Sequence, residues 1–208
     1  MGMYVQLRQG SAWLNLPGYL PELVASGVDT SHCLLCTDDS HPHTLVDDGH
    51  VDRVLREAVR LGLDPVTALQ MATINAAQYF GVGRDMGSIT PGKCADIVLL
   101  RDLERFEAKA VYIDGTLAAE DGKATFATKP FTWPAFMTHT MNLGVDITPR
   151  AFEIPVNHKD GSIWVRAIGI NAGDTLTRDS TVKTIVRDGK IQADPTHDVL
   201  KACVFDRH

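Results

Sequence analysis

The sequence predicts an α/β region followed by a β-rich region. Up to residue 81, short apolar runs of strand composition alternate with helical apolar repeats, an order typical of parallel strands connected by helices. After Gly81, glycine and the pairs Pro-Gly and Asp-Gly separate short apolar runs instead, which is typical of antiparallel hairpins. The boundary between the two regions is therefore expected near Gly81.

Two apolar runs of the first region have the composition of β-strands. Residues 2–7 include the strand formers Tyr4 and Val5 and lead into a polar loop over residues 8–11. Residues 31–37 are apolar on both faces, as in a parallel strand that is covered on both sides. The polar segment of residues 38–49, with its proline and glycine, is predicted to be a loop.

Helical spacing and helix-boundary residues predict helices over residues 21–26, 51–61 and 65–80. Pro21 suits the first turn of the first helix, and Gly62 ends the second. Asp64 and Pro65 supply the N-cap and the first residue of the third helix, which Gly81 ends. Met71 lies on the apolar face of that helix and is expected in the core.

Asp-Gly pairs mark the expected hairpins of the second region. Asp114-Gly115 separates two apolar runs, and residues 184–191 repeat the pattern of residues 110–117 around a second Asp-Gly pair. The proline-containing residues 125–160 are predicted to connect the first hairpin to a second β-rich segment over residues 163–205.

Composition narrows the classes of protein. The 208 residues are 44% hydrophobic and 22% charged, with a formal net charge of −6 and no run of basic residues. Nucleic-acid and membrane partners are therefore not expected. The apolar stretches are short for a membrane span, and no signal-peptide pattern is present, so a cytoplasmic location is expected.

Cys33 and Cys36 form a CxxC motif, which in isolation fits half of a zinc site or a redox pair. The motif falls in a predicted strand, where residues three apart point to opposite faces, and the chain has no second CxxC. Buried structural thiols are therefore the favoured interpretation.

The pair Asp38-Asp39 directly follows the second predicted strand. The carboxyl ends of parallel strands are where catalytic side chains gather in barrel and doubly wound folds. With His41, His43 and His50 nearby, the pair fits a metal or proton-transfer site. A solvated acidic loop with an Asx turn remains the alternative. His41-Pro42-His43 similarly fits either a metal-binding HxH or a polar loop, and His50 either a helix cap or a site residue.

Several motifs together resemble the adenine deaminases of the amidohydrolase superfamily. Residues 87–99 resemble a stretch common to many amidohydrolases, whereas the pairing of Thr-Asp-Asp with Gly-His-x-Asp is more specific to adenine deaminases. The resemblance extends over essentially the whole chain. Its motifs lie at residues 8–12, 36–39, 49–52, 70–77, 87–99, 188–190, 194–195 and 206–208.

The resemblance implies a fold of α/β plus β type. Residues 1–82 would hold the last two strands of a (β/α)8 barrel, residues 83–125 strands of a β-sandwich, and residues 126–208 most of a β-rich C-terminal domain. The implied activity, a step of purine salvage, is hydrolytic deamination of adenine to hypoxanthine and ammonia. The implied cofactor is a divalent metal, Mn²⁺ or Fe²⁺, which activates a water molecule.

The resemblance also implies roles for single residues. Asp38 would be the catalytic carboxylate that touches the metal and moves the proton. Asp39, His41 and His50 would be second-tier site residues, with Asp39 a hydrogen-bond partner for the loop or the substrate. A homo-oligomer is expected for a complete enzyme.

The sequence departs from the superfamily pattern in its metal ligands. The HxH motif of the first barrel strand and the ligands of strands four to six have no counterpart in these residues, and two strands cannot close a barrel. We therefore expect the chain alone to be inactive. Two alternatives stay open: an amidohydrolase acting on another cyclic amide or amidine, and a non-catalytic subunit that pairs with a chain carrying the HxH site.

Overall fold

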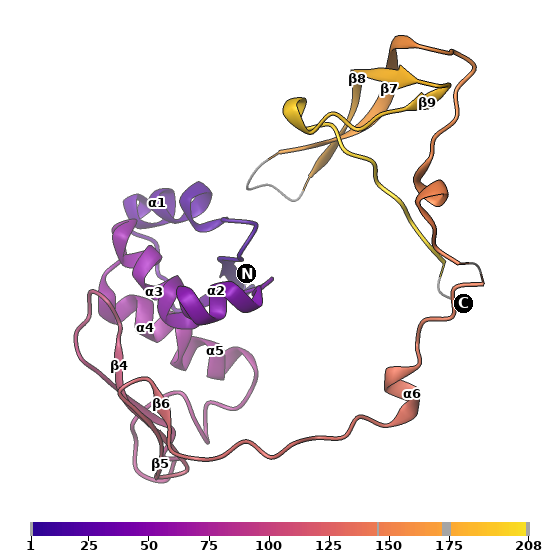
Figure 1. Ribbon diagram of the computed structural model, residues 1–208. Helices are drawn as coiled ribbons and strands as arrows, with labels where there is room; N and C mark the ends of the chain where they lie inside the picture. Colours follow the sequence, from indigo (N-terminus) through magenta and orange to yellow (C-terminus); the bar gives the residue numbers. More distant parts are fainter. Residues whose placement is uncertain (1, 145, 172–175, 207–208) are drawn as a thin grey trace. The chain divides into compact units, whose positions relative to one another are not determined.

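The computed structural model describes residues 2–144, 146–171 and 176–206 (Figure 1). Contacts divide the chain into two units, the first Met1–Thr128 and the second Lys129–Asn171 with Leu176–His208. Among the described residues, none of the helices combines the length and the apolar character that a membrane crossing requires.

The first unit begins with two parallel strands and five helices. The strands pair in register, with Arg8 opposite Cys36, and a helix connects them, as a parallel pair requires. The elements are β1 (Val5–Arg8), α1 (Leu16–Ser26), β2 (Cys33–Cys36), α2 (Pro42–Asp47), α3 (Val51–Arg60), α4 (Pro65–Ala72) and α5 (Ile74–Tyr79). The predicted α/β character of this region is confirmed.

One hydrophobic core joins β1, α1, β2, α3 and α4. Leu16 and Leu20 of α1, Val54 of α3 and Met71 of α4 are each 0% exposed, and they cluster with Leu35 of β2. Strand β2 is buried through its first three residues, as its two-sided apolar pattern predicted. Figure 1 shows the helices, drawn in indigo to magenta, gathered together in this unit.

The cysteine prediction is confirmed in part. Cys33 is buried and Cys36 is half-buried at the end of β2, and both are free thiols. Burial raises the pKa of the Cys33 thiol above its ordinary value, which favours the neutral form of a packing residue.

Three of the helix predictions are wrong. Helix α1 begins at Leu16 rather than at residue 21, so Pro21 lies inside it, and Pro17 is the proline of its first turn. Helix α2 replaces the loop expected before Gly49, because Pro42 takes the first helical position after an extended His41. The helix expected over residues 65–80 is broken at Thr73, which leaves helical geometry. After the break, the amide of the buried Asn75 donates to the carbonyl oxygens of Thr30 (3.0 Å) and Cys33 (2.9 Å).

A four-stranded antiparallel sheet completes the first unit. Its strands are β3 (Ile97–Leu100), β4 (Ala108–Ile113), β5 (Thr116–Glu120) and β6 (Lys123–Ala124), in that spatial order. Phe106, between β3 and β4, is 1% exposed and belongs to the hydrophobic core of the helices. This contact attaches the sheet to the α/β part of the unit.

The second unit carries a three-stranded antiparallel sheet. Its elements are α6 (Ala135–Thr138), η1 (Pro149–Phe152), β7 (Gly161–Ile170), β8 (Thr177–Arg187), β9 (Lys190–Ile191) and η2 (Pro195–His197). Strands β7, β8 and β9 follow one another in space as in sequence. Both predicted Asp-Gly hairpins are confirmed, since β4 and β5 pair around the first turn and β8 and β9 around the second.

Candidate active site at the strand ends

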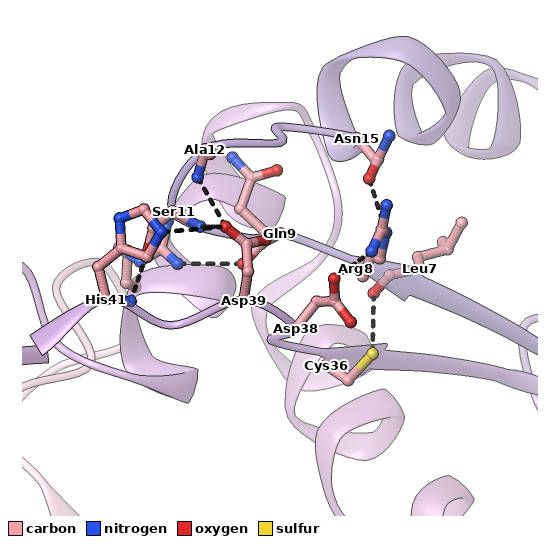
Figure 2. A network of polar contacts seen from close by, with 11 residues as sticks. Leu7, Arg8, Gln9, Ser11, Ala12, Asn15, Cys36, Asp38, Asp39 and His41 are labelled. Carbon is pink, nitrogen blue, oxygen red and sulfur yellow. Dashed lines mark hydrogen bonds and ion pairs between the residues drawn. The ribbon is translucent and has the colours of Figure 1, made fainter. Parts of the chain in front are cut away.

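The carboxyl ends of β1 and β2 lie at one edge, because the two strands are parallel and in register. The loop of residues 9–15 leaves β1 there, and the loop of residues 37–41 leaves β2. Figure 2 shows that side chains from the two loops face one another and form a network of polar contacts. Asp38 and Asp39 both belong to this network, at the edge where the sequence predicted a site.

Asp38 is bound by an arginine from the neighbouring strand. Nη1 of Arg8, the last residue of β1, forms an ion pair with Oδ2 of Asp38. Nε of the same guanidinium donates to Oδ1 of Asn15 at 2.9 Å (Figure 2). Asn15 is the N-cap residue of α1, so the arginine connects the end of β1, the start of α1 and the catalytic candidate.

Asp39 points the other way and binds the β1 loop. Its Oδ2 accepts hydrogen bonds from the N–H groups of Ser11 (3.1 Å) and Ala12 (2.9 Å). Its carbonyl oxygen also accepts from Ser11 N–H at 2.7 Å. The hydrogen bond from Ala12 N–H lowers the pKa of the Asp39 carboxyl below its ordinary value. The two adjacent aspartates thus have different partners, Asp39 backbone amides and Asp38 a guanidinium.

Gly10 is required where the two loops meet. A Cβ atom added at Gly10 would lie 1.7 Å from Oδ1 of Asp39 and 3.1 Å from the carbonyl oxygen of Trp13. Arg53 of α3 donates to the carbonyl oxygens of Gln9 (3.0 Å) and Gly10 (3.1 Å). The β1 loop is therefore held by Asp39 on one side and by a core helix on the other.

The structure places the histidines at different points around the network. The backbone N–H of His41 donates to Oγ of Ser11 at 2.9 Å. The ring Nε2 of His41 lies 3.9 Å from Oδ2 of Asp39. His43 stacks obliquely on His41, with the ring centroids 5.5 Å apart. Of the two second-tier histidines, His41 is therefore the one that lies near Asp39.

His50, the other second-tier candidate, contacts the start of the Asp38 loop. Its imidazole Nε2 lies 3.3 Å from Oγ1 of Thr37, and its backbone N–H donates to Oδ1 of Asp52 at 2.7 Å. His50 precedes α3, and its side chain makes no capping hydrogen bond there. The geometry therefore places the imidazole beside the loop that carries Asp38.

The network does not by itself form a metal centre. Over the described parts of the chain, no three side chains of His, Cys, Asp or Glu are grouped so that they could hold a metal ion. The carboxylate of Asp38 faces a positive charge in this structure instead. The residues present therefore do not fit a complete metal site.

Sequence reasoning missed Arg8, which it placed in a polar loop. The available signal was its position directly after an apolar run, since the last residue of a parallel strand reaches the catalytic edge. Its partner could not be read from the sequence, because the pairing depends on the register between β1 and β2.

Comparison with known proteins adds to this geometry. Residues 19–118 match the model of the amidohydrolase family, a range that includes β2, Asp38 and the sheet up to β5. Among solved structures, a β-aspartyl dipeptidase from Fervidobacterium islandicum AW-1 is 22% identical with a TM-score of 0.48, covering 61% of this chain and 36% of that chain.

The curated relatives match the entire chain. An adenine deaminase of Clostridium botulinum (strain Loch Maree) is 42% identical over 208 residues, which is 100% of this chain and 35% of that protein. An adenine deaminase of Roseobacter denitrificans is 38% identical over 207 residues, 100% of this chain and 34% of that protein. The chain spans about a third of the length of these curated relatives.

These matches confirm the resemblance that the motifs indicated. The chain is related to the amidohydrolases through residues 19–118. Over its whole length, it is similar to the adenine deaminases within that class.

Proposed function

We propose that this chain serves hydrolytic deamination of adenine, as part of an enzyme that converts adenine and water to hypoxanthine and ammonia. The observation that carries the proposal is the extent of the similarity. The amidohydrolase match ends at residue 118, whereas the similarity to adenine deaminases continues through all 208 residues and so includes the second unit. An amidohydrolase with another cyclic substrate is the competing assignment, and it leaves this continuation unexplained.

We further propose that β1 and β2 are the last two strands of a (β/α)8 barrel, within residues 1–82. Their parallel pairing, the helix between them and the gathering of polar side chains at their carboxyl ends support this assignment. Residues 83–125 would then be strands of a flanking β-sandwich, and residues 126–208 a domain shared with adenine deaminases.

In this proposal Asp38 is the catalytic carboxylate. It stands directly after β2, and its side chain is 43% exposed, so a substrate and a water molecule can reach it. Its oxygen would take the proton of the attacking water and deliver it toward the ring nitrogen and the departing ammonia. Asp39 would hold the β1 loop, and His41 and His50 would line the approach.

A divalent metal, Mn²⁺ or Fe²⁺, belongs to the proposal by resemblance. If it were bound, such an ion would lower the pKa of a water molecule. Asp38 is the one residue of this chain that we assign to it. The further ligands would have to come from outside the described residues.

A chimera tests the proposed function. In the Clostridium botulinum adenine deaminase, this chain replaces the segment that it matches. Ammonia and hypoxanthine are then measured with adenine as substrate, after the metal content has been determined. We expect the chimera to deaminate adenine, and we expect the isolated chain not to do so with added Mn²⁺.

Two results would contradict the proposal. One is a folded, metal-loaded chimera that leaves adenine unchanged but hydrolyses another cyclic amide or amidine. The other is activity of the isolated chain, which would show that the further metal ligands are not needed from elsewhere. The same enzyme with the matched segment deleted is the negative control.

A further inference from the structure

The ion pair of Arg8 with Asp38 is a contact at the strand ends that the proposed reaction does not use. Arg8 is the last residue of β1, and it lies opposite Cys36, the last residue of β2. Asp38 follows two residues after Cys36. The guanidinium is held from a second direction by the side chain of Asn15. It is therefore a fixed group rather than a freely moving charge.

A contribution to the free energy of folding does not explain why Arg8 and Asp38 are paired. The side chains of Arg8 and Asp38 are 32% and 43% exposed, and exposed ion pairs contribute little to the free energy of folding. Arg60 and Glu57 of α3 form a comparable exposed pair, joined by two hydrogen bonds of 2.7 Å. What distinguishes the pair of Arg8 and Asp38 is its place at the carboxyl edge of the parallel strands.

The backbone around Asp38 and its side chain are held by different residues. The hydrogen bonds of Asp39 to Ser11 and Ala12 hold the chain directly after Asp38, but they do not involve the Asp38 side chain. The Asp38 side chain is paired with Arg8 instead. Adenine carries no anionic group, so the proposed substrate offers the guanidinium no charge partner of its own.

We propose that Arg8 is a positioning residue, which holds the Asp38 carboxylate in the orientation needed for proton transfer. The inference rests on the proposed function for its catalytic consequence, but the orienting contact itself belongs to this chain. A misplacement of about 1 Å in a reacting group can reduce a rate about 100-fold, so loss of the contact should act on kcat.

The first arm of the test uses the chimeric enzyme. Arg8→Gln is expected to lower kcat about 10- to 100-fold with KM for adenine changed less than about twofold, while Arg8→Lys recovers part of the loss. In the Asp38→Asn background, Arg8→Gln is expected to have no further effect on the residual rate, since the group it positions is gone. Arg60→Gln, the matched exposed pair, is expected to leave the rate unchanged.

The second arm uses the 208-residue chain and does not require activity. Scalar couplings measured by NMR report the χ1 rotamers of Asp38. We expect one dominant rotamer with Arg8 present and averaging among rotamers in Arg8→Gln, with no change in Arg60→Gln.

The two arms separate the possible failures. An inactive parent chimera contradicts the proposed function, and the NMR arm then decides the positioning role by itself. An Asp38 rotamer distribution that is the same with and without Arg8 overturns the positioning proposal, as does an Arg8→Gln enzyme with the kcat of its parent.

Discussion

The two antiparallel sheets contain hairpin turns of the same geometry, but they differ in how they are packed. The hairpin of β4 and β5 turns at Asp114 (φ 49°) and Gly115 (φ 75°), and that of β8 and β9 at Asp188 (φ 50°) and Gly189 (φ 71°). These positive angles at both central residues are those of a type I′ turn, which Asp-Gly favours. The local sequence therefore accounts for both turns.

The similarity extends to the residues that bind the turns. In each sheet, the backbone N–H of the turn aspartate donates to the carboxylate of another aspartate, which lies just before the first strand of the sheet. The backbone N–H of the turn glycine donates to the backbone carbonyl oxygen of the residue before that second aspartate. The binding residues are Ala95 and Asp96 in the first sheet and Lys159 and Asp160 in the second. The repeat noticed in the sequence is thus a repeated structural unit.

Packing is where the two sheets differ. In the first unit, Phe106 next to β4 is 1% exposed within the hydrophobic core. In the second unit, Val186 of β8 is also 1% exposed but lies outside that core, and Trp164 and Ile168 of β7 are 70% and 69% exposed. The backbone angles of the turns therefore follow from their Asp-Gly pairs, whereas burial depends on elements far along the chain.

The largest expected effect comes from the packing difference. Phe106→Ala is expected to lower the free energy of unfolding by about 3–5 kcal/mol, because it empties a filled position of the core. Trp164→Ala, at an exposed position, is expected to change it by less than about 0.5 kcal/mol. Urea denaturation followed by circular dichroism measures both. Equal losses would show that the two sheets are covered to the same degree.

A smaller and equal effect is expected at the two turn glycines. Gly115→Ala and Gly189→Ala each force a side chain into the left-handed region, at a cost of about 1–2 kcal/mol. Both glycines have room for a Cβ atom, whose nearest neighbours lie at 3.7 Å, so backbone strain is the sole expected cause. A difference of more than about 1 kcal/mol between the two variants in the same denaturation experiment would break the equivalence of the turns.

The aspartates that bind the turns should have a lesser effect. Asp96→Ala and Asp160→Ala each remove one hydrogen bond to a turn N–H, 2.8 Å and 3.0 Å long, respectively. A loss of about 0.5–1.5 kcal/mol is expected for each. Amide hydrogen exchange at Asp114 and Asp188 should accelerate in the corresponding variant and stay unchanged in the other.

The smallest effect concerns pH. The N–H of Thr67 lowers the pKa of the Asp64 carboxyl, the N-cap of α4, below its ordinary value. A folded pKa below the unfolded one stabilises the protein above the unfolded pKa of about 4, and this contribution disappears as the pH falls through the folded pKa. Asp64→Ala should therefore lower the melting temperature at pH 7 and have a smaller effect at pH 3. An equal effect at both values would contradict the assignment.

The parts of the fold that could be predicted from the sequence are those with local causes. The Asp-Gly turns, the cap at Asp64 and the buried strand β2 follow from neighbouring residues, and the structure agrees with all three. The break at Thr73 could not be predicted, since no Gly or Pro marks it, and the contact of Asn75 that follows it is made with distant carbonyl groups. For the same reason, the site could be predicted as an edge with Asp38 and Asp39, but not as an arrangement that includes Arg8.

The catalytic role of Asp38 is tested most directly by substituting each of the two adjacent aspartates in the chimeric enzyme. Asp38→Asn is expected to lower kcat for adenine by about 10²- to 10⁴-fold, because it removes the proton-transferring carboxylate. Asp39→Asn is expected to lower it less, because that side chain holds the loop through hydrogen bonds to Ser11 and Ala12. A metal-loaded Asp38→Asn enzyme that deaminates adenine at the rate of its parent would contradict the assignment of Asp38 as the catalytic residue.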